Sequence, residues 1–487
     1  MDYEKGTSST PAPGHVQTTP TDLPILSSSV SHTEPPHHVQ KVATNVSQRS
    51  KTIKEEDVRP SEDEDFTEVT YPEGGREAWL VVLGSFISMV ASFGIMNTLG
   101  VIQAHLVKNQ LHGEDEGKVG WIFGIYSFLS FFGGIIIGPL FDTYGPRRLL
   151  ASGTISLLGG LVAFAFSKEY YQMALSFGIL VGSGTSLIFT PAIASIGHFF
   201  LKRRAYATGV ATTGGSIGGI IFPLALQSLF PKLGFQNAVL VLALICFVFL
   251  AVGNFLIRSR AILRSQSSAK IDIHAFKDLR FTLTAWGVFF IEWALFVPIT
   301  YISSYTQSIG FSLEFSYQLL AILNVGSVFG RWLPGLVADR IGRFNTMVLT
   351  IMFCFISVIA FWLPTVPSIS DVPHNTAKGL LVVWALTYGF ASGTGISLTP
   401  VCVGQICETS EYGTKYGTLY FLVSFGPLTG VPIAGAILEN MRLRREDGTV
   451  SDRWEGLVAF TAASYIGAWC MFLAARGIGG GWKWKKW

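Results

Sequence analysis

Long apolar stretches separated by short polar connections fill the chain after about residue 70. The hydrocarbon core of a bilayer is about 30 Å thick, and a helix needs about 20 apolar residues to cross it. Stretches of this length predict an all-α integral membrane protein with twelve transmembrane helices, at 79–103, 118–140, 149–166, 172–196, 205–230, 236–257, 281–304, 315–337, 344–363, 378–402, 416–438 and 456–475.

The two halves of this pattern repeat each other. The segment 138–148, where the 118–140 helix ends, matches 335–343, where the 315–337 helix ends. The segment 183–191 matches 392–400 in the same way. Because alternating-access transporters rock two similar bundles around a central site, the repeat favours a transporter.

The repeat also predicts the domain organisation. Two six-helix bundles at 76–257 and 281–476 are joined by a basic cytosolic linker at 258–280. Residues 1–75 are polar and rich in Ser, Thr and Pro, which predicts a disordered cytosolic N-terminal tail. Residues 477–487 are predicted to be a cytosolic tail whose Trp and Lys side chains meet membrane lipid.

Charge sets the expected orientation. Only 14% of the residues are charged, against 49% hydrophobic, and the net charge is +3. Basic residues gather in the connections that follow the even-numbered helices, so the positive-inside rule puts both termini in the cytosol. Basic residues at helix ends do not form a nucleic-acid surface. No sorting signal is legible, so the plasma membrane is the default location.

The sequence gives no sign of enzyme chemistry. The five cysteines lie in or beside apolar stretches without paired loop spacing, so they are predicted to be small core residues and not metal ligands or disulfides. The spans carry no paired catalytic carboxylates, His cluster or nucleophile–base pair. We therefore expect no metal, no cofactor and no enzymatic activity.

Three motifs resemble a known family. The Gly-x-x-x-Asp-x-x-Gly-x-Arg-Arg pattern of 138–148 resembles that of the major facilitator superfamily. Tyr71-Pro-Glu-Gly-Gly and the segment 198–209 resemble two signatures of its monocarboxylate-porter family, especially the fungal members. The resemblance covers residues 71 to about 476.

Charged residues at the predicted cytoplasmic mouth are candidates for a gate. Asp142 can pair with Arg147 or Arg148 and face a neighbouring helix terminus, and Asp339 with Arg343 can do the same in the second half. The family resemblance implies a cytoplasmic latch. The alternative is that these charges only fix the topology.

Arg331 is a candidate substrate ligand. An ionised group within a span is costly and needs a partner or water. Asn324, Ser327 and Arg331 share one face of the 315–337 helix. A guanidinium suits a carboxylate, and the resemblance implies that this arginine binds the substrate anion. A structural ion pair inside the bundle is the alternative.

Glu292 lies near the middle of the 281–304 helix. Its carboxyl group either exchanges a proton with the cavity or neutralises Arg331 across the bundle, and the sequence favours neither. Proton-coupled members of the family carry a lysine where alignment places Asn97, and an aspartate where Ser327 stands. These departures put lactate-type proton symport in doubt and favour a larger or less acidic solute.

Pro191 and Pro400 are predicted to kink their helices, because proline removes a backbone donor.

Taken together, these features predict a secondary transporter of a small organic solute, and they favour export of a metabolite. One alternative is proton-coupled uptake of a monocarboxylate or vitamin-like nutrient. A non-transporting solute sensor is the alternative from another class.

Overall fold

The computed structural model describes residues 71–112, 114, 116–260, 272–441, 443–444, 450–451, 453–482 and 486–487. All of them belong to one compact unit, Val39–Trp487. The predicted tail at 1–75 therefore lies outside the described residues up to position 70. From there on, Tyr71 is buried and the first helix begins at Gly75.

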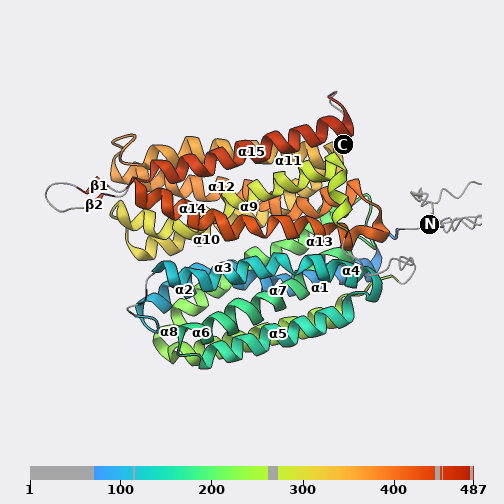
Figure 1. Ribbon diagram of the computed structural model, residues 1–487, viewed down its shortest axis with the longest axis horizontal. Coiled ribbons are helices and arrows are strands. Elements are labelled where there is room, and N and C mark those ends of the chain that lie inside the picture. Colours follow the sequence, from blue (N-terminus) through green and yellow to red (C-terminus); the bar gives the residue numbers. More distant parts are fainter. Residues whose placement is uncertain are drawn as a thin grey trace, which may run out of the picture. The chain divides into compact units, whose positions relative to one another are not determined.

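Helices form almost all of the described chain (Figure 1). In the first half they are α1 (Gly75–Met96), α2 (Leu99–Lys108), α3 (Glu116–Phe132), α4 (Gly134–Tyr144), α5 (Pro146–Phe166), α6 (Tyr170–Met173), the π-helix η1 (Ala174–Val181), α7 (Gly182–Ile196) and α8 (Arg204–Leu256).

The second half of the chain lies beside the first half (Figure 1). It begins with the 3-10 helix η3 (Ile273–Lys277). Its other elements are α9 (Leu279–Ser308), α10 (Leu313–Ile341), α11 (Arg343–Ser357), the π-helix η4 (Val358–Trp362), η5 (Leu363–Thr365), α12 (His374–Ile406), η6 (Thr409–Glu411), α13 (Tyr412–Val423), α14 (Phe425–Asn440) and α15 (Glu455–Gly480).

Among the described residues, these elements form twelve helices of membrane length. Within the described ranges, 11 helical stretches are long and apolar enough to cross a membrane. One of them, α8, has 53 residues, which is about 80 Å of helix and far more than one crossing needs. It is broken at Gly234, where φ is 72° and ψ is 171°, so it contains two crossings. The predicted all-α fold is confirmed.

Two details differ from the expectation. The connection before α15 carries a short antiparallel ribbon in which β1 (Leu443–Arg444) pairs with β2 (Val450–Ser451). Helix α15 also runs to Gly480 instead of ending near 476. Beyond it, Trp487 packs its ring 4.2 Å from that of Phe344 and accepts a hydrogen bond from the Phe344 N–H. This end of the chain is therefore docked on α11.

Three of the five cysteines that were predicted to be core residues are buried. Cys246, Cys354 and Cys402 are buried as expected, whereas Cys470 on α15 is exposed. Helix α7 continues through Pro191 and α12 continues through Pro400, so a bend at either proline stays a prediction. The two π-helical segments lie away from these prolines, since η1 precedes α7 and η4 follows α11.

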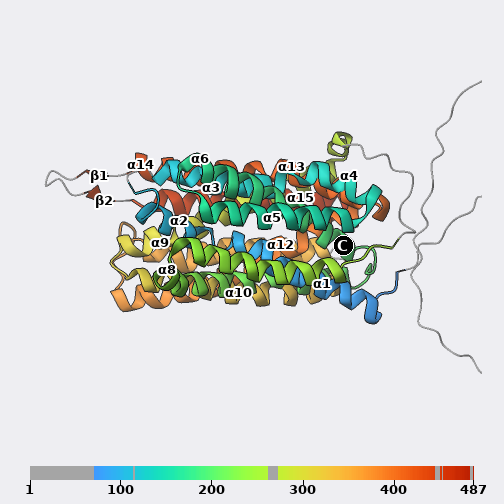
Figure 2. The same ribbon diagram turned by 90° about the horizontal axis from the view of Figure 1, so that it is seen from below.

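Close backbone contact holds the helices together. Helix α8 packs on α1 within the first half, and α10 packs on α8 between the halves (Figure 2). At Gly218, an added Cβ would lie 2.6 Å from the Cα of Gly94, and at Gly214 it would overlap the carbonyl oxygen of Phe86. Such contacts replace the hydrophobic force that is missing between helices in lipid.

We expect Gly214→Leu to destabilise the first half, because its side chain has no space against α1. Overpacking of this kind costs about 1–3 kcal/mol or more. The matched control is Gly159→Leu, since an added Cβ there meets no atom within 4 Å. Thermal unfolding in detergent, followed by the loss of monodisperse protein, should show a lower Tm for the first variant alone. Equal Tm values for the two variants would contradict this packing.

Candidate functional site

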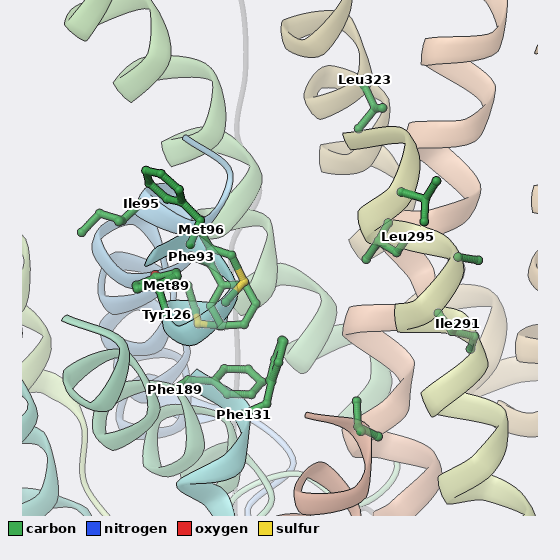
Figure 3. Close-up of a cluster of buried hydrophobic side chains, with 14 of the residues drawn as sticks. Met89, Phe93, Ile95, Met96, Tyr126, Phe131, Phe189, Ile291, Leu295 and Leu323 are labelled. Carbon is green, nitrogen blue, oxygen red and sulfur yellow. The ribbon is translucent and has the colours of Figure 1, made fainter. Parts of the chain in front are cut away.

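A cavity of about 1470 Å³ lies between the two halves. Its mouth is lined by exposed residues at the ends of helices, among them Lys108, Asn109 and Gln307, and we call this the open end. Four of the side chains that line the cavity are labelled in Figure 3, with Phe93 and Phe131 of the first half on one side and Leu295 and Leu323 of the second half on the other. The cavity is much larger than a three-carbon acid needs.

Arg331 lies at the bottom of this cavity and is only 2% exposed. Its Nε donates to the Ser327 hydroxyl at 3.2 Å, one helical turn away on α10. Its Nη1 donates to the carbonyl of Thr212 on α8 at 2.6 Å. The guanidinium fits there because position 215 is glycine, where an added Cβ would lie 3.0 Å from Nη1. One buried charge therefore joins both halves.

Two asparagines border the same cavity. The Asn324 side-chain nitrogen donates to the Leu320 carbonyl at 3.1 Å, and the Asn97 side-chain nitrogen donates to the Gly215 carbonyl at 3.0 Å. Ser327 accepts a further bond from the Ser216 hydroxyl at 3.0 Å. The fold thus brings Asn97, Asn324, Ser327, Arg331 and Glu292 to one cavity.

Glu292 on α9 is 1% exposed and lines the cavity. Within the described part of the chain, it forms no ion pair with Arg331, and its buried Oε2 has no hydrogen-bond partner. The two opposite charges nevertheless attract each other across the space between them. Both interpretations of Glu292, neutralisation of Arg331 across the bundle and proton exchange, therefore stay predictions. The carboxyl group remains available to a proton or a ligand.

Aromatic rings close the bottom of the cavity. Phe93 and Phe131 line it, and Phe131 stacks on Tyr420 of α13 with ring centroids 5.3 Å apart. Tyr412, Tyr416 and Tyr420 follow one another along α13 with centroids 5.5 and 4.7 Å apart. Sequence reasoning missed this stack, although the spacing of four residues between its tyrosines was legible.

At the other end of the helices, which we call the closed end, two aspartates bind helix N-termini of the opposite half. Asp142 on α4 accepts from the N–H groups of Gly413 and Thr414 at 3.0 and 2.7 Å. Asp339 on α10 accepts from the N–H groups of Ala205 and Tyr206 at 3.3 and 3.0 Å. Each carboxylate thus meets the positive end of a helix dipole.

The expected helix termini are present at both aspartates, whereas no hydrogen bond or ion pair joins either aspartate to its predicted arginine among the residues described. Arg147 and Arg148 are exposed and make no hydrogen bond or ion pair to Asp142 among the residues described. Arg343 donates to the Leu201 carbonyl and not to the Asp339 carboxylate. A helix N-terminus supplies fixed N–H donors, whereas pairing with an exposed arginine would restrict a long side chain for little gain.

Further contacts between the halves at the closed end were not expected. Arg204 at the start of α8 is 2% exposed, and its guanidinium lies 4.0 Å from the ring centroid of Tyr412 in the second half. The Tyr71 hydroxyl lies 2.6 Å from that of Thr409. Glu73, two residues later, accepts from the N–H groups of 201–203. The lead-in to α1 therefore also bridges the halves.

Comparisons with known proteins agree with this architecture. The model of the Major Facilitator Superfamily matches residues 81–377. The chain is 35% identical to "Riboflavin transporter MCH5" of Saccharomyces cerevisiae, over 86% of this chain and 81% of the relative. It is 34% identical to "Aspyridones efflux protein apdF" of Emericella nidulans, over 76% of this chain and 73% of the relative.

A third relative, "MFS-type transporter pynF" of Aspergillus niger, is 34% identical over 84% of this chain and 90% of its own length. Among solved structures, a bacterial homologue of the iron transporter ferroportin in its outward-facing state matches with a TM-score of 0.60. It covers 83% of this chain and 100% of that one at 14% identity, which supports the fold alone.

We expect Asp142→Asn to loosen the closed end, because the amide keeps one accepting oxygen and loses the charge that faces α13. Hydrogen bonds to charged groups contribute about 1.5–3 kcal/mol each, so opening should become at least roughly tenfold more frequent. Buried Cys402, as the only cysteine retained, reports this through its alkylation rate. Arg148→Gln is the control and should leave the rate unchanged. Faster labelling in the control alone would contradict the assignment.

Proposed function

Because the chain belongs to the Major Facilitator Superfamily, whose members similar to it are transporters of small solutes and not enzymes, we propose that it exports an organic metabolite by alternating access. The observation that carries this proposal is the single cavity that brings Arg331 and Glu292 together while both aspartate contacts hold the closed end shut.

Two contacts of the same design support a gate. Asp142 reaches from the first half to α13, and Asp339 reaches from the second half to α8. Both must break for the halves to part at the closed end, and both can re-form when they meet again. A contact that exists in one state and not in the other gives a two-state equilibrium that a ligand in the cavity can shift.

The charge distribution supports an orientation. Exposed basic side chains gather at the closed end, at Arg147, Arg148, Lys202, Arg203 and Arg340. By the positive-inside rule this end faces the cytosol, and the described chain begins and ends on that side. The cavity then opens to the outside in this conformation. The plasma membrane remains the proposed location.

The names of the relatives support transport of organic solutes, and one of them also states a direction. One carries the name of an efflux protein and one that of a riboflavin transporter. Asn97 and Ser327 replace the lysine and aspartate of proton-coupled monocarboxylate carriers, which favours the export of a metabolite. Proton-coupled uptake of a monocarboxylate or a vitamin-like nutrient, with Glu292 as the proton carrier, is the alternative function, and the unpartnered Oε2 of Glu292 is the observation that favours it.

We expect Arg331→Ala to abolish the solute gradient that the protein maintains, with a loss of at least about 100-fold, because it removes the charged donor at the bottom of the cavity. Arg331→Lys keeps the charge and should restore only part of it, since one ammonium cannot span both Ser327 and Thr212. Untargeted comparison of metabolites inside and outside cells measures the gradient. An unchanged gradient at equal protein abundance would remove Arg331 from the site.

The alternative, proton-coupled function predicts that Glu292→Gln makes transport independent of pH between about pH 5 and 8, because glutamine cannot exchange a proton. The control is Glu77→Gln, at an exposed position in the first turn of α1. Initial rates across a pH series in reconstituted vesicles measure the effect. If the Glu292→Gln variant kept the pH profile of the natural protein, Glu292 would not be the proton carrier.

A further inference from the structure

Arg204 is a cation buried between the two halves. It is the first residue of α8 and is 2% exposed. An added Cβ at Gly197 of the first half would overlap its Nη2, and one at Gly404 of the second half would overlap its Nη1. The guanidinium is therefore enclosed from both halves, in space that the two glycines leave open.

The charge of Arg204 is poorly compensated in this conformation. Nη1 and Nη2 are buried and have no hydrogen-bond partner among the residues described, and no ion pair there reaches Arg204. The carboxylates of Asp142 and Asp339 are bound to N–H groups at the starts of α13 and α8. The guanidinium contacts the face of the Tyr412 ring instead, 4.0 Å from its centroid. Such a cation–π contact returns only part of the hydration that a buried guanidinium loses.

Two further electrostatic effects oppose the closed conformation. Arg204 places a positive charge at the N-terminus of α8, the positive end of the helix dipole, and Asp339 offsets only part of this effect. Arg343, the first residue of α11 in the second half, is close enough for the two positive charges to repel each other. Water between parted halves would weaken both effects, because electrostatic interactions fall as the polarity of the surroundings rises.

We propose that Arg204 favours opening of the closed end, in opposition to the two aspartate contacts that hold this end shut. When the halves part, the guanidinium gains water and moves away from Arg343, so its charge is better solvated than in the closed conformation. A transporter must leave each conformation as well as enter it, and a destabilising group shifts the equilibrium away from the closed one. The inference rests on the proposed function, in which this end opens in every transport cycle.

The opposite assignment is a clamp, in which the contact between Arg204 and Tyr412 holds the halves together. The two assignments predict effects of opposite sign. Removing the charge shuts the closed end more firmly if Arg204 favours opening, and it loosens this end if Arg204 is a clamp.

Spin labels at exposed positions 148 and 411, one in each half, report opening of the closed end in the full-length protein in lipid vesicles. The Asp142→Asn variant is the background, because it is expected to raise the open fraction. Adding Arg204→Met, which keeps an unbranched side chain without the charge, should lower the open fraction at least roughly tenfold, since it removes buried donors that have no partner. Adding Arg203→Met at the exposed neighbouring position is the control and should leave the open fraction unchanged.

An open fraction that rises or stays the same when Arg204→Met is added would overturn the inference and leave alternating access standing. Distances that stay fixed in every variant would contradict opening at this end, so the proposed function would fail together with the inference.

Thermal unfolding separates this effect from damage to the fold. Because Arg204→Met removes a charge that destabilises the closed conformation, we expect its Tm in detergent to equal or exceed that of the natural protein. Arg204→Gln is a second neutral variant and should behave in the same way if methionine does not fit between the two glycines. A lower Tm in both neutral variants would show that the guanidinium stabilises the closed end, which would overturn the inference.

Discussion

A guanidinium buried between membrane-crossing helices must be held by hydrogen bonds, and this requirement joins the two halves. Arg331 extends from α10 but meets its closest acceptor, the Thr212 carbonyl, on α8 of the other half. Glycine at 215 makes room for it, and Ser327, itself bound by Ser216, fixes its second nitrogen. The same pair of helices carries the Asp339 contact at the closed end. The packing of α10 against α8 thus links the bottom of the cavity to the gate.

The contact between α4 and α13 repeats the Asp339 contact with the two halves exchanged. Asp142 lies on α4 and binds the start of α13, just as Asp339 lies on α10 and binds the start of α8. The internal repeat that is visible in the sequence is therefore a repeat of contacts between the halves as well as of helices. Two equivalent contacts close one end, and the cavity opens at the other, which is the geometry that alternating access requires.

Hydrophobic length predicted the twelve helices because lipid leaves the backbone no other choice. Arg331 and Glu292 were found from the cost of placing ionisable groups in spans. Asn324 and Ser327 followed from the helical face that they share with Arg331, and Asn97 from the resemblance to the family. A neighbouring helix terminus was expected at Asp142 and Asp339, but the sequence could not show which helix supplies it. Asp142 meets backbone N–H groups on α13, and backbone donors leave no mark in a sequence, whereas Arg147 and Arg148 stood beside it as visible alternatives. The ring contact of Arg204 with Tyr412 was hidden too, because the two residues lie in different halves and far apart in the sequence. The break at Gly234, in contrast, falls in the connection predicted between the helices at 205–230 and 236–257.

Asn97 and Ser327 shape the surroundings of Arg331. The Asn97 side-chain nitrogen donates to the Gly215 carbonyl on α8, the helix whose Thr212 carbonyl also binds Arg331. Ser327 gives Arg331 a neutral partner, so the nearest carboxylate in the cavity stands apart on Glu292. The sequence resemblance implies a lysine and an aspartate at these two positions in proton-coupled carriers, and this difference is one reason to propose another mode of transport.

The most direct measurement of the central claim is the distance between spin labels across each end of the reconstituted protein. One pair is placed at exposed positions 148 and 411 of the closed end and the other at 109 and 307 of the open end. Alternating access predicts that a transported solute shifts the two distance distributions in opposite directions. Distributions that stay fixed, or that widen together, would contradict the account.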